Sequence, residues 1–162
     1  ITHKERDYQN PKLEAYCKRI TSLLLFGDVE KLNQYEVQQV KTWLQWKRVD
    51  LCAEFYLLNK ETQKEEKYAL LLENKVYTSI HDNQLENYKQ LFQQDYEGED
   101  TFLEYVYFSC KDTLSDWEKE QCAAAGYRAY TMNEVLDLVQ GDQTWDFTGN
   151  ALFDEFWLST WG

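Results

Sequence analysis

Apolar residues recur with two different periods along the chain, and these periods separate the helices from the strands. The i, i+3, i+4, i+7 spacing of an amphipathic helix occurs in residues 12–26, at Leu13, Tyr16, Cys17, Ile20, Leu23 and Leu24. Pro11 at the start of this segment and Gly27 just after it are typical helix boundaries. The pattern therefore predicts one long helix at the beginning of the chain.

The centre of the sequence predicts three strands. Residues 36–45 place a few apolar side chains among polar ones, whereas residues 47–58 and 67–77 are mostly apolar. The segment 59–66 between the second and third strands is wholly polar, which is typical of an exposed hairpin connection. Because the third strand is the most apolar of the three, we expect it to lie in the middle of a sheet.

The remaining elements alternate between helix and strand. We predict helices over residues 82–94, 116–125, 132–140 and 150–161, and strands over residues 101–110 and 127–130. Thr131 and Glu134 have the spacing of a capping box at the start of the third of these helices. The order αβββαβ, followed by a further strand and helices, predicts an α/β fold in which helices flank a mixed central β-sheet.

Length and composition indicate a folded single domain. The chain has 162 residues, of which 43% are apolar and 16% aromatic. No apolar stretch approaches the roughly 18 residues of a membrane span and no signal peptide is visible, so we expect a cytoplasmic protein without membrane contact. Its four cysteines lie far apart in the sequence without zinc-site spacing, and we expect reduced thiols.

The charge of the chain is unevenly distributed. Its net charge is −12, which is unfavourable for contact with nucleic-acid phosphates. Residues 1–75, however, carry 13 Lys or Arg and 12 Asp or Glu, whereas residues 76–162 carry 4 and 17. We therefore expect a nucleic-acid surface to come from the first half, and the acidic second half to be a solvated face or a surface for a basic partner.

The candidate chemistry lies in and around the most apolar strand. Glu73 and Lys75 interrupt this strand two residues apart, so they share one face, and charges in so apolar a strand need a metal, a partner or a substrate. Asp50 in the preceding strand supplies a second carboxylate. Gln84 and Tyr88 are four residues apart in the following helix and share a face.

These residue types suit phosphodiester hydrolysis. Asp50 and Glu73 can provide the one or two carboxylates that Mg²⁺ takes, and a metal there can polarise a phosphate and activate water. Lys75 can stabilise the charge of the transition state, Gln84 can orient the water or Lys75, and Tyr88 can contact the backbone or close the pocket. Taken singly, each motif is more often ordinary surface; their order and context favour the catalytic interpretation.

At this point the chain resembles a known family. The runs Arg48-Val49-Asp50-Leu51, Leu72-Glu73-Asn74-Lys75-Val76 and Asp82-Asn83-Gln84-Leu85-Glu86-Asn87-Tyr88 are similar to motifs of the PD-(D/E)XK nuclease superfamily, most of all its bacterial branch. The C-terminal strand and helices are similar too, so the resemblance spans roughly residues 36–160. Val49 stands where the superfamily name has proline.

The resemblance implies a restriction-endonuclease-like core and Mg²⁺-dependent cleavage, with Mn²⁺ as a substitute and Asp50, Glu73 and Lys75 as the core triad. The superfamily usually carries a further Glu on a preceding helix, for which Glu14 and Glu36 are unmatched candidates. We predict one nuclease-like domain over residues 1–162, with the alternative that an N-terminal helix is missing because the chain begins at Ile1.

Three functions follow as hypotheses. The first is a Mg²⁺-dependent nuclease acting on DNA in genome defence or repair, with Lys41, Lys47 and Arg48 as nucleic-acid-binding residues. The second is a catalytically silent nuclease-fold module with an acidic partner-binding surface. The third, an enzyme of another class, has little support because the sequence has no nucleotide loop, nucleophile elbow or zinc spacing. A homodimer or a protein partner is an open possibility for the first two.

Overall fold

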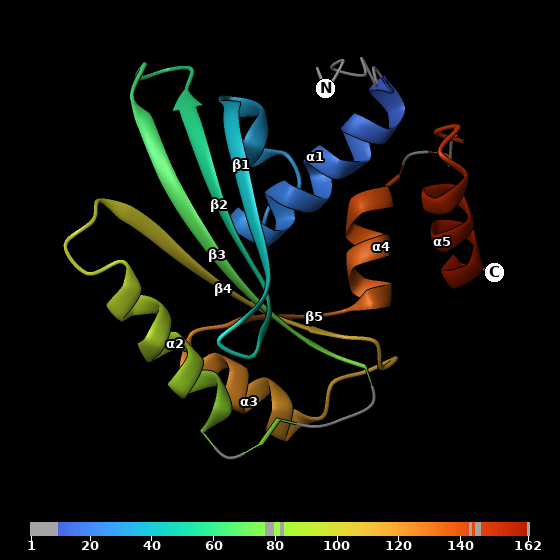
Figure 1. Cartoon of the computed structure of the whole chain (residues 1–162). Coiled ribbons are helices and arrows are strands. Elements are labelled where there is room, and N and C mark those ends of the chain that lie inside the picture. Colours follow the sequence, from blue (N-terminus) through green and yellow to red (C-terminus); the bar gives the residue numbers. More distant parts are fainter. Residues whose placement is uncertain (1–9, 77–79, 82, 143, 145–146, 162) are drawn as a thin grey trace, which may run out of the picture.

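The fold is built on one mixed five-stranded sheet with the order β1-β2-β3-β4-β5 (Figure 1). The structure is a computed structural model that describes residues 10–76, 80–81, 83–142, 144 and 147–161. The strands are β1 (Tyr35–Trp46), β2 (Val49–Asn59), β3 (Glu65–Lys75), β4 (Thr101–Ser109) and β5 (Arg128–Thr131). β1, β2 and β3 pair in antiparallel fashion, and β3, β4 and β5 pair in parallel fashion. The central place expected for the most apolar strand, β3, is therefore confirmed.

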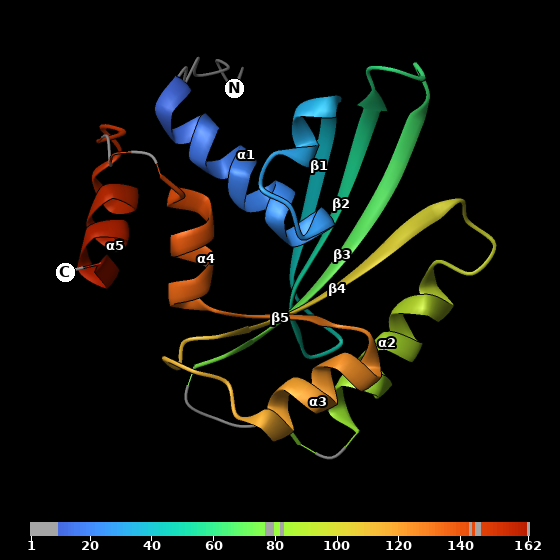
Figure 2. The same cartoon turned by 180° about the vertical axis from the view of Figure 1, so that it is seen from behind.

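Helices cover both faces of the sheet, as Figures 1 and 2 show from opposite sides. α2 (Gln84–Asp95) and α3 (Asp116–Ala125) lie on one face, and α1 (Pro11–Phe26) and α4 (Met132–Gln140) lie on the other. α5 (Ala151–Trp161) packs outside α1, where the rings of Tyr16 and Trp157 lie 5.3 Å apart. A short 3-10 helix, η1 (Lys31–Gln34), leads into β1.

The two faces of β3 are buried in two different cores. Leu71 packs with Phe92 and Tyr107 under α2 and α3, whereas Leu70 packs with Leu25 and Leu57 under α1. This alternation follows from the period of two along a strand. It places Glu73 and Lys75, which have the same parity as Leu71, on the α2 face of the sheet.

Local signals explain most element boundaries. Asn10 accepts a hydrogen bond from the Leu13 amide at the start of α1, and Gly27 ends the helix with a φ of 69°. Thr131 and Glu134 form both hydrogen bonds of the predicted capping box. The predicted elements are all present with small shifts at their ends. Tyr77 and Asp82, which bounded two of the predicted elements, lie outside the described residues.

The start of the second strand differs from the prediction. The sequence predicts that the second strand begins at residue 47, but β2 begins at Val49, and Lys47 and Arg48 form a two-residue turn between Trp46 and Val49. No Gly or Asn marks this turn in the sequence. Among the described residues, no helix is long and apolar enough to cross a membrane.

Candidate active site

Four of the predicted site residues meet at the C-terminal end of β3. Glu73 Oε1 accepts hydrogen bonds from Lys75 Nζ at 2.8 Å and from Gln84 Nε2 at 3.0 Å. Gln84 Nε2 also lies 3.0 Å from the Tyr88 hydroxyl, its i+4 neighbour on α2. β3 therefore supplies the Glu–Lys pair, and the first two turns of α2 supply the groups that fix it.

Glu73 is buried, with only 2% of its surface exposed. Burial raises the pKa of its carboxyl, Lys75 acts in the opposite direction, and the charge of Asp50 raises the pKa further. The net shift is upward, so Glu73 binds its proton more tightly here than a glutamate in water does.

Two buried oxygens of this cluster have no hydrogen-bond partner among the described residues. They are Glu73 Oε2 and Gln84 Oε1, and both are acceptors. A buried acceptor without a donor is costly, and native structures rarely keep one without a role. Two such oxygens, one on Glu73 and one on the Gln84 that is hydrogen-bonded to it, suit a cation or a donor-rich substrate.

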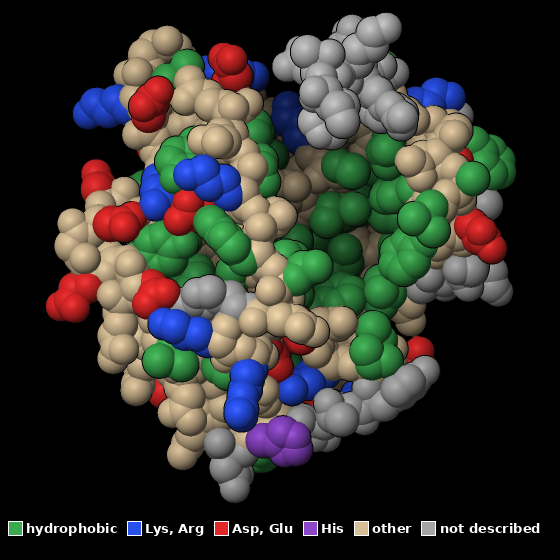
Figure 3. All heavy atoms as spheres, viewed as in Figure 1, with side chains coloured by type: hydrophobic (Ala, Val, Ile, Leu, Met, Phe, Trp, Pro, Cys, Tyr) green, Lys and Arg blue, Asp and Glu red, His purple; other side chains and the backbone are tan. Residues whose placement is uncertain are grey.

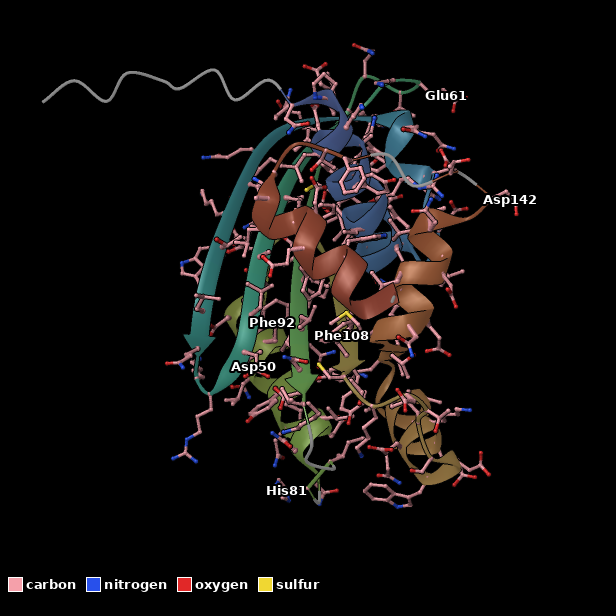
Figure 4. The ribbon with its side chains drawn as sticks, turned by 90° about the vertical axis from the view of Figure 1, so that its right-hand side faces the viewer. Asp50, Glu61, His81, Phe92, Phe108 and Asp142 are labelled. Atoms are coloured by element: carbon pink, nitrogen blue, oxygen red, sulfur yellow. The ribbon has the colours of Figure 1, made fainter. Side chains whose placement is uncertain are left out.

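Asp50 approaches the cluster from β2. Its Oδ2 accepts a hydrogen bond of 2.7 Å from the backbone amide of Asn74, the residue between Glu73 and Lys75. The β2–β3 pairing ends on this side with Leu51 and Leu72, and continuing its register would set Asp50 opposite Glu73. Figure 4 shows Asp50 beside the β1–β2 turn, toward the end of the sheet where His81 lies. Asp50 is exposed, so one face of its carboxylate remains open to solvent.

The β1–β2 turn brings positive charge to the same region. Both turn residues have positive φ, 47° at Lys47 and 75° at Arg48. The Tyr88 hydroxyl lies 3.4 Å from the Arg48 carbonyl oxygen, to which it donates, so α2 links the turn to Glu73 through Gln84. Lys47 forms an ion pair of 2.9 Å with Asp95 near the end of α2.

Lys41 lies apart from this cluster. It is further back along β1, where its ammonium contacts the Tyr56 hydroxyl at 3.2 Å and Glu54 at 4.0 Å. Glu14 and Glu36, the candidates for a further glutamate, both line a cavity between α1 and β1. Because α1 covers the opposite face of the sheet from α2, the structure does not bring Glu14 to Glu73.

A second buried Glu–Lys pair lies beside the first and was not singled out from the sequence. Glu118 Oε1 lies 2.8 Å from Lys111 Nζ and 3.3 Å from the Tyr107 hydroxyl, and Tyr107 pairs with Glu73 across β3 and β4. Burial acts to raise the pKa of Glu118, but hydrogen bonds from Lys111 and Ser115 outweigh it and lower the pKa. The Ser115–Glu118 capping box was a detectable signal; the approach of Lys111 was not.

The fold and this cluster define an α/β protein with a buried Glu–Lys pair and a nearby aspartate at one end of a mixed sheet. A family model described as the PD-(D/E)XK nuclease superfamily matches residues 4–146. The chain therefore belongs to the PD-(D/E)XK nuclease superfamily, and the resemblance and the fold class inferred from its sequence are confirmed. No curated protein matches the chain. Nucleases of this superfamily generally use divalent metal ions and bind nucleic acid, and membership supports a nuclease-type function.

Proposed function

We propose that the protein is a Mg²⁺-dependent nuclease that hydrolyses phosphodiester bonds in DNA, with Asp50, Glu73 and Lys75 as its catalytic core. The observation that carries this proposal is that two buried oxygens of this cluster, Glu73 Oε2 and Gln84 Oε1, have no hydrogen-bond partner among the described residues, although Glu73 is bound to Lys75 and Gln84. A purely structural Glu–Lys pair in a core needs no further acceptors, whereas a metal and substrate site does.

The donor set suits a hard divalent cation. Asp50 and Glu73 would hold it, and together they provide the one or two carboxylates that Mg²⁺ usually takes from a protein. Within the described ranges no group of three or more His, Cys, Asp or Glu side chains gathers to hold a metal. Water and phosphate oxygens would then complete the coordination, and a bound metal supplies Lewis-acid polarisation of the phosphate and a more acidic water. Mn²⁺, which also accepts oxygen ligands, is expected to substitute.

The side chains of the chain itself have distinct roles in this proposal. Lys75 is held by Glu73 with only 11% of its side chain exposed, so its ammonium is ordered and poorly solvated. In such surroundings it stabilises the negative charge that develops on phosphate more strongly than a solvated lysine does. Gln84 positions Glu73, and Tyr88 positions Gln84 and the β1–β2 turn.

The turn residues Lys47 and Arg48 are proposed to contact the DNA backbone beside the core. Both residues are exposed. The Tyr88 hydroxyl donates a hydrogen bond to the Arg48 carbonyl oxygen and also contacts Gln84, so it connects the turn to the core. Lys41, which precedes this turn in β1, is a candidate for contact with a more distant phosphate of the DNA. These cations locally offset the net charge of −12, which otherwise opposes DNA binding.

A catalytically silent binding module is the second candidate, and the acidic residues 76–162 favour it. That segment carries 17 Asp or Glu and 4 Lys or Arg, a surface that suits a basic protein partner better than DNA. Under this alternative, the Glu73–Lys75 pair is a structural remnant, and no metal should restore cleavage.

The test is cleavage of labelled substrates by the full chain with Mg²⁺ or Mn²⁺ and with EDTA. The panel comprises supercoiled plasmid, duplex, single-stranded and branched DNA, and RNA, so that it also defines the substrate. Glu73→Ala should abolish cutting, whereas Glu61→Ala should not, because Glu61 lies at the opposite end of the sheet (Figure 4). No cutting of any substrate would favour the silent module.

A further inference from the structure

The outer edge of β1 has features that point to a protein partner. β1 closes one end of the sheet order and pairs with β2 on its other side. Two of its valines are largely exposed, Val37 at 43% and Val40 at 47%. Both line the cavity of about 450 Å³ between β1 and α1, and Figure 3 shows a hollow bordered by hydrophobic side chains on this side of the molecule. Charged residues and bulges limit unspecific pairing along such an edge strand, so a partner of β1 has to match both its charges and its bulge.

A β-bulge determines which way the side chains of this edge point. Val37 lies opposite Leu57 and Val40 lies opposite Phe55, and both partners belong to the core under α1. Residues three apart in a regular strand point to opposite faces, but the register shifts between Val37 and Gln39. The bulge therefore puts both valines on the α1 face. The strand period sets Glu36, opposite Leu58, and Lys41, opposite Glu54, on the α2 face, although Glu36 also borders the α1-side cavity at the start of β1.

The sequence around the bulge is nearly palindromic in its chemistry. Residues 35–42 read Tyr-Glu-Val-Gln-Gln-Val-Lys-Thr. When this strand is set antiparallel to itself about its midpoint, Glu36 lies opposite Lys41, Val37 opposite Val40, and Gln38 opposite Gln39. Residues opposite each other in an antiparallel pair must share a face, and the bulge makes this true for the charged pair and for the valine pair.

We infer that β1 is a homodimer interface, in which β1 of a second copy of this chain pairs antiparallel with it about Gln38 and Gln39. The two-fold axis generates each contact twice, so the interface holds two Glu36–Lys41 pairs and two Val37–Val40 pairs. Main-chain hydrogen bonds on either side of the bulge and the covered valines supply the attraction, and the charged pairs fix the register. The two five-stranded sheets become one continuous sheet.

The geometry also separates dimerisation from catalysis. β1 runs antiparallel to its copy, and the register of β1, β2 and β3 sets Glu73 level with the C-terminal end of β1, so the two sites face opposite ends of the joined sheet. Each site then acts by itself. The dimer does not rest on the proposed nuclease activity, because Glu73→Gln should leave it unchanged.

The test is sedimentation of the full chain over a concentration series, where the dimer has twice the chain mass of 19.5 kDa. Glu36→Lys creates two like-charge contacts with Lys41, and Lys41→Glu creates two with Glu36. Each substitution should weaken the dimer by about tenfold or more. Glu120→Lys makes the same charge change on α3, away from β1, and should have no effect.

Complementation distinguishes this register from a general effect of charge. Mixing the Glu36→Lys chain with the Lys41→Glu chain pairs opposite charges again at every position, so the mixture should form a heterodimer although each variant alone does not. The double variant Glu36→Lys/Lys41→Glu should dimerise like the wild type. The inference is overturned if the wild-type chain stays monomeric over the whole concentration series, or if it forms a dimer whose stability these substitutions do not change.

Discussion

At Arg48, the backbone conformation favours glycine, whereas the proposed contact with DNA requires the arginine side chain. It occupies the second position of the β1–β2 turn with a φ of 75°, in the left-handed region that glycine adopts readily and other residues do not. Two-residue hairpin turns with two positive φ values favour Asn-Gly, yet this chain has Lys47-Arg48. If the arginine is retained for contact with phosphate, Arg48→Gly should make the protein more stable and a poorer DNA binder.

The magnitude follows from two opposing terms. Relieving a left-handed conformation at a residue with a Cβ gains about 1–2 kcal/mol. The greater freedom of glycine in the unfolded chain costs about 0.5–1 kcal/mol of this gain. The net stabilisation is about 0.5–1 kcal/mol, which for a domain of this size raises Tm by roughly 1–4 °C. The hydrogen bond from Tyr88 reaches the backbone oxygen of residue 48, so the substitution should preserve it.

Arg48→Ala is the matched control, because it removes the charge and keeps the strained Cβ. Thermal melts should show stabilisation by Arg48→Gly alone. DNA affinity measured over a salt series should fall for both variants, and the slope of log K against log salt should decrease by about 0.9 for the lost phosphate contact. Equal stability of the two variants would refute the strain argument, and an unchanged salt slope in both would refute the role of Arg48.

Three further predictions concern the core and the fold. Because burial raises the pKa of Glu73, the folded chain holds the proton of the Glu73 carboxyl more tightly than the unfolded chain does. The contribution of Glu73 to folding stability is therefore greatest below the ordinary glutamate pKa and is lost as the pH rises through the raised pKa of the folded state. Calorimetry in EDTA should therefore show Glu73→Gln more stable than wild type at neutral pH, and Mn²⁺ should no longer shift its Tm; an unchanged Mn²⁺ response would place the metal elsewhere. Tyr88→Phe removes the hydroxyl that contacts Gln84 and the Arg48 carbonyl, and should cost about 1 kcal/mol by denaturant titration and slow cleavage without changing the metal requirement. Thr131→Ala breaks the capping box of α4 and should cost about 1 kcal/mol in stability with cleavage unaffected; a loss of cleavage would contradict the separation of α4 from the site.

The sequence predicted those elements whose signals are local. α1 has regular apolar spacing between Pro11 and Gly27, and β3 has an apolar run that only a central strand can bury. Glu73 and Lys75 share a face by the period of a strand, and Gln84 and Tyr88 share one by the period of a helix. The family motifs added the expectation that these two pairs meet, and the hydrogen bond from Gln84 to Glu73 shows that they do.

The features that the sequence did not predict depend on contacts between elements. The Lys47–Arg48 turn lacks the usual turn residues, and its place is set by the pairing of β1 with β2. The Lys111–Glu118 pair joins the segment after β4 to α3, and no spacing rule connects those residues. The common face of Val37 and Val40 arises from a bulge that becomes visible only once β2 provides a register.

The role of the Glu73–Lys75 cluster is tested by the single-turnover cleavage rate of Lys75→Ala in saturating Mg²⁺, on the substrate that the wild-type chain cuts best. Lys64→Ala, an exposed lysine in the β2–β3 connection at the other end of the sheet, is the matched control. Lys75→Ala should fold, bind DNA and not cut, whereas Lys64→Ala should cut at the wild-type rate. Wild-type cleavage by a folded Lys75→Ala chain would contradict the assignment of the Glu73–Lys75 cluster as the active site.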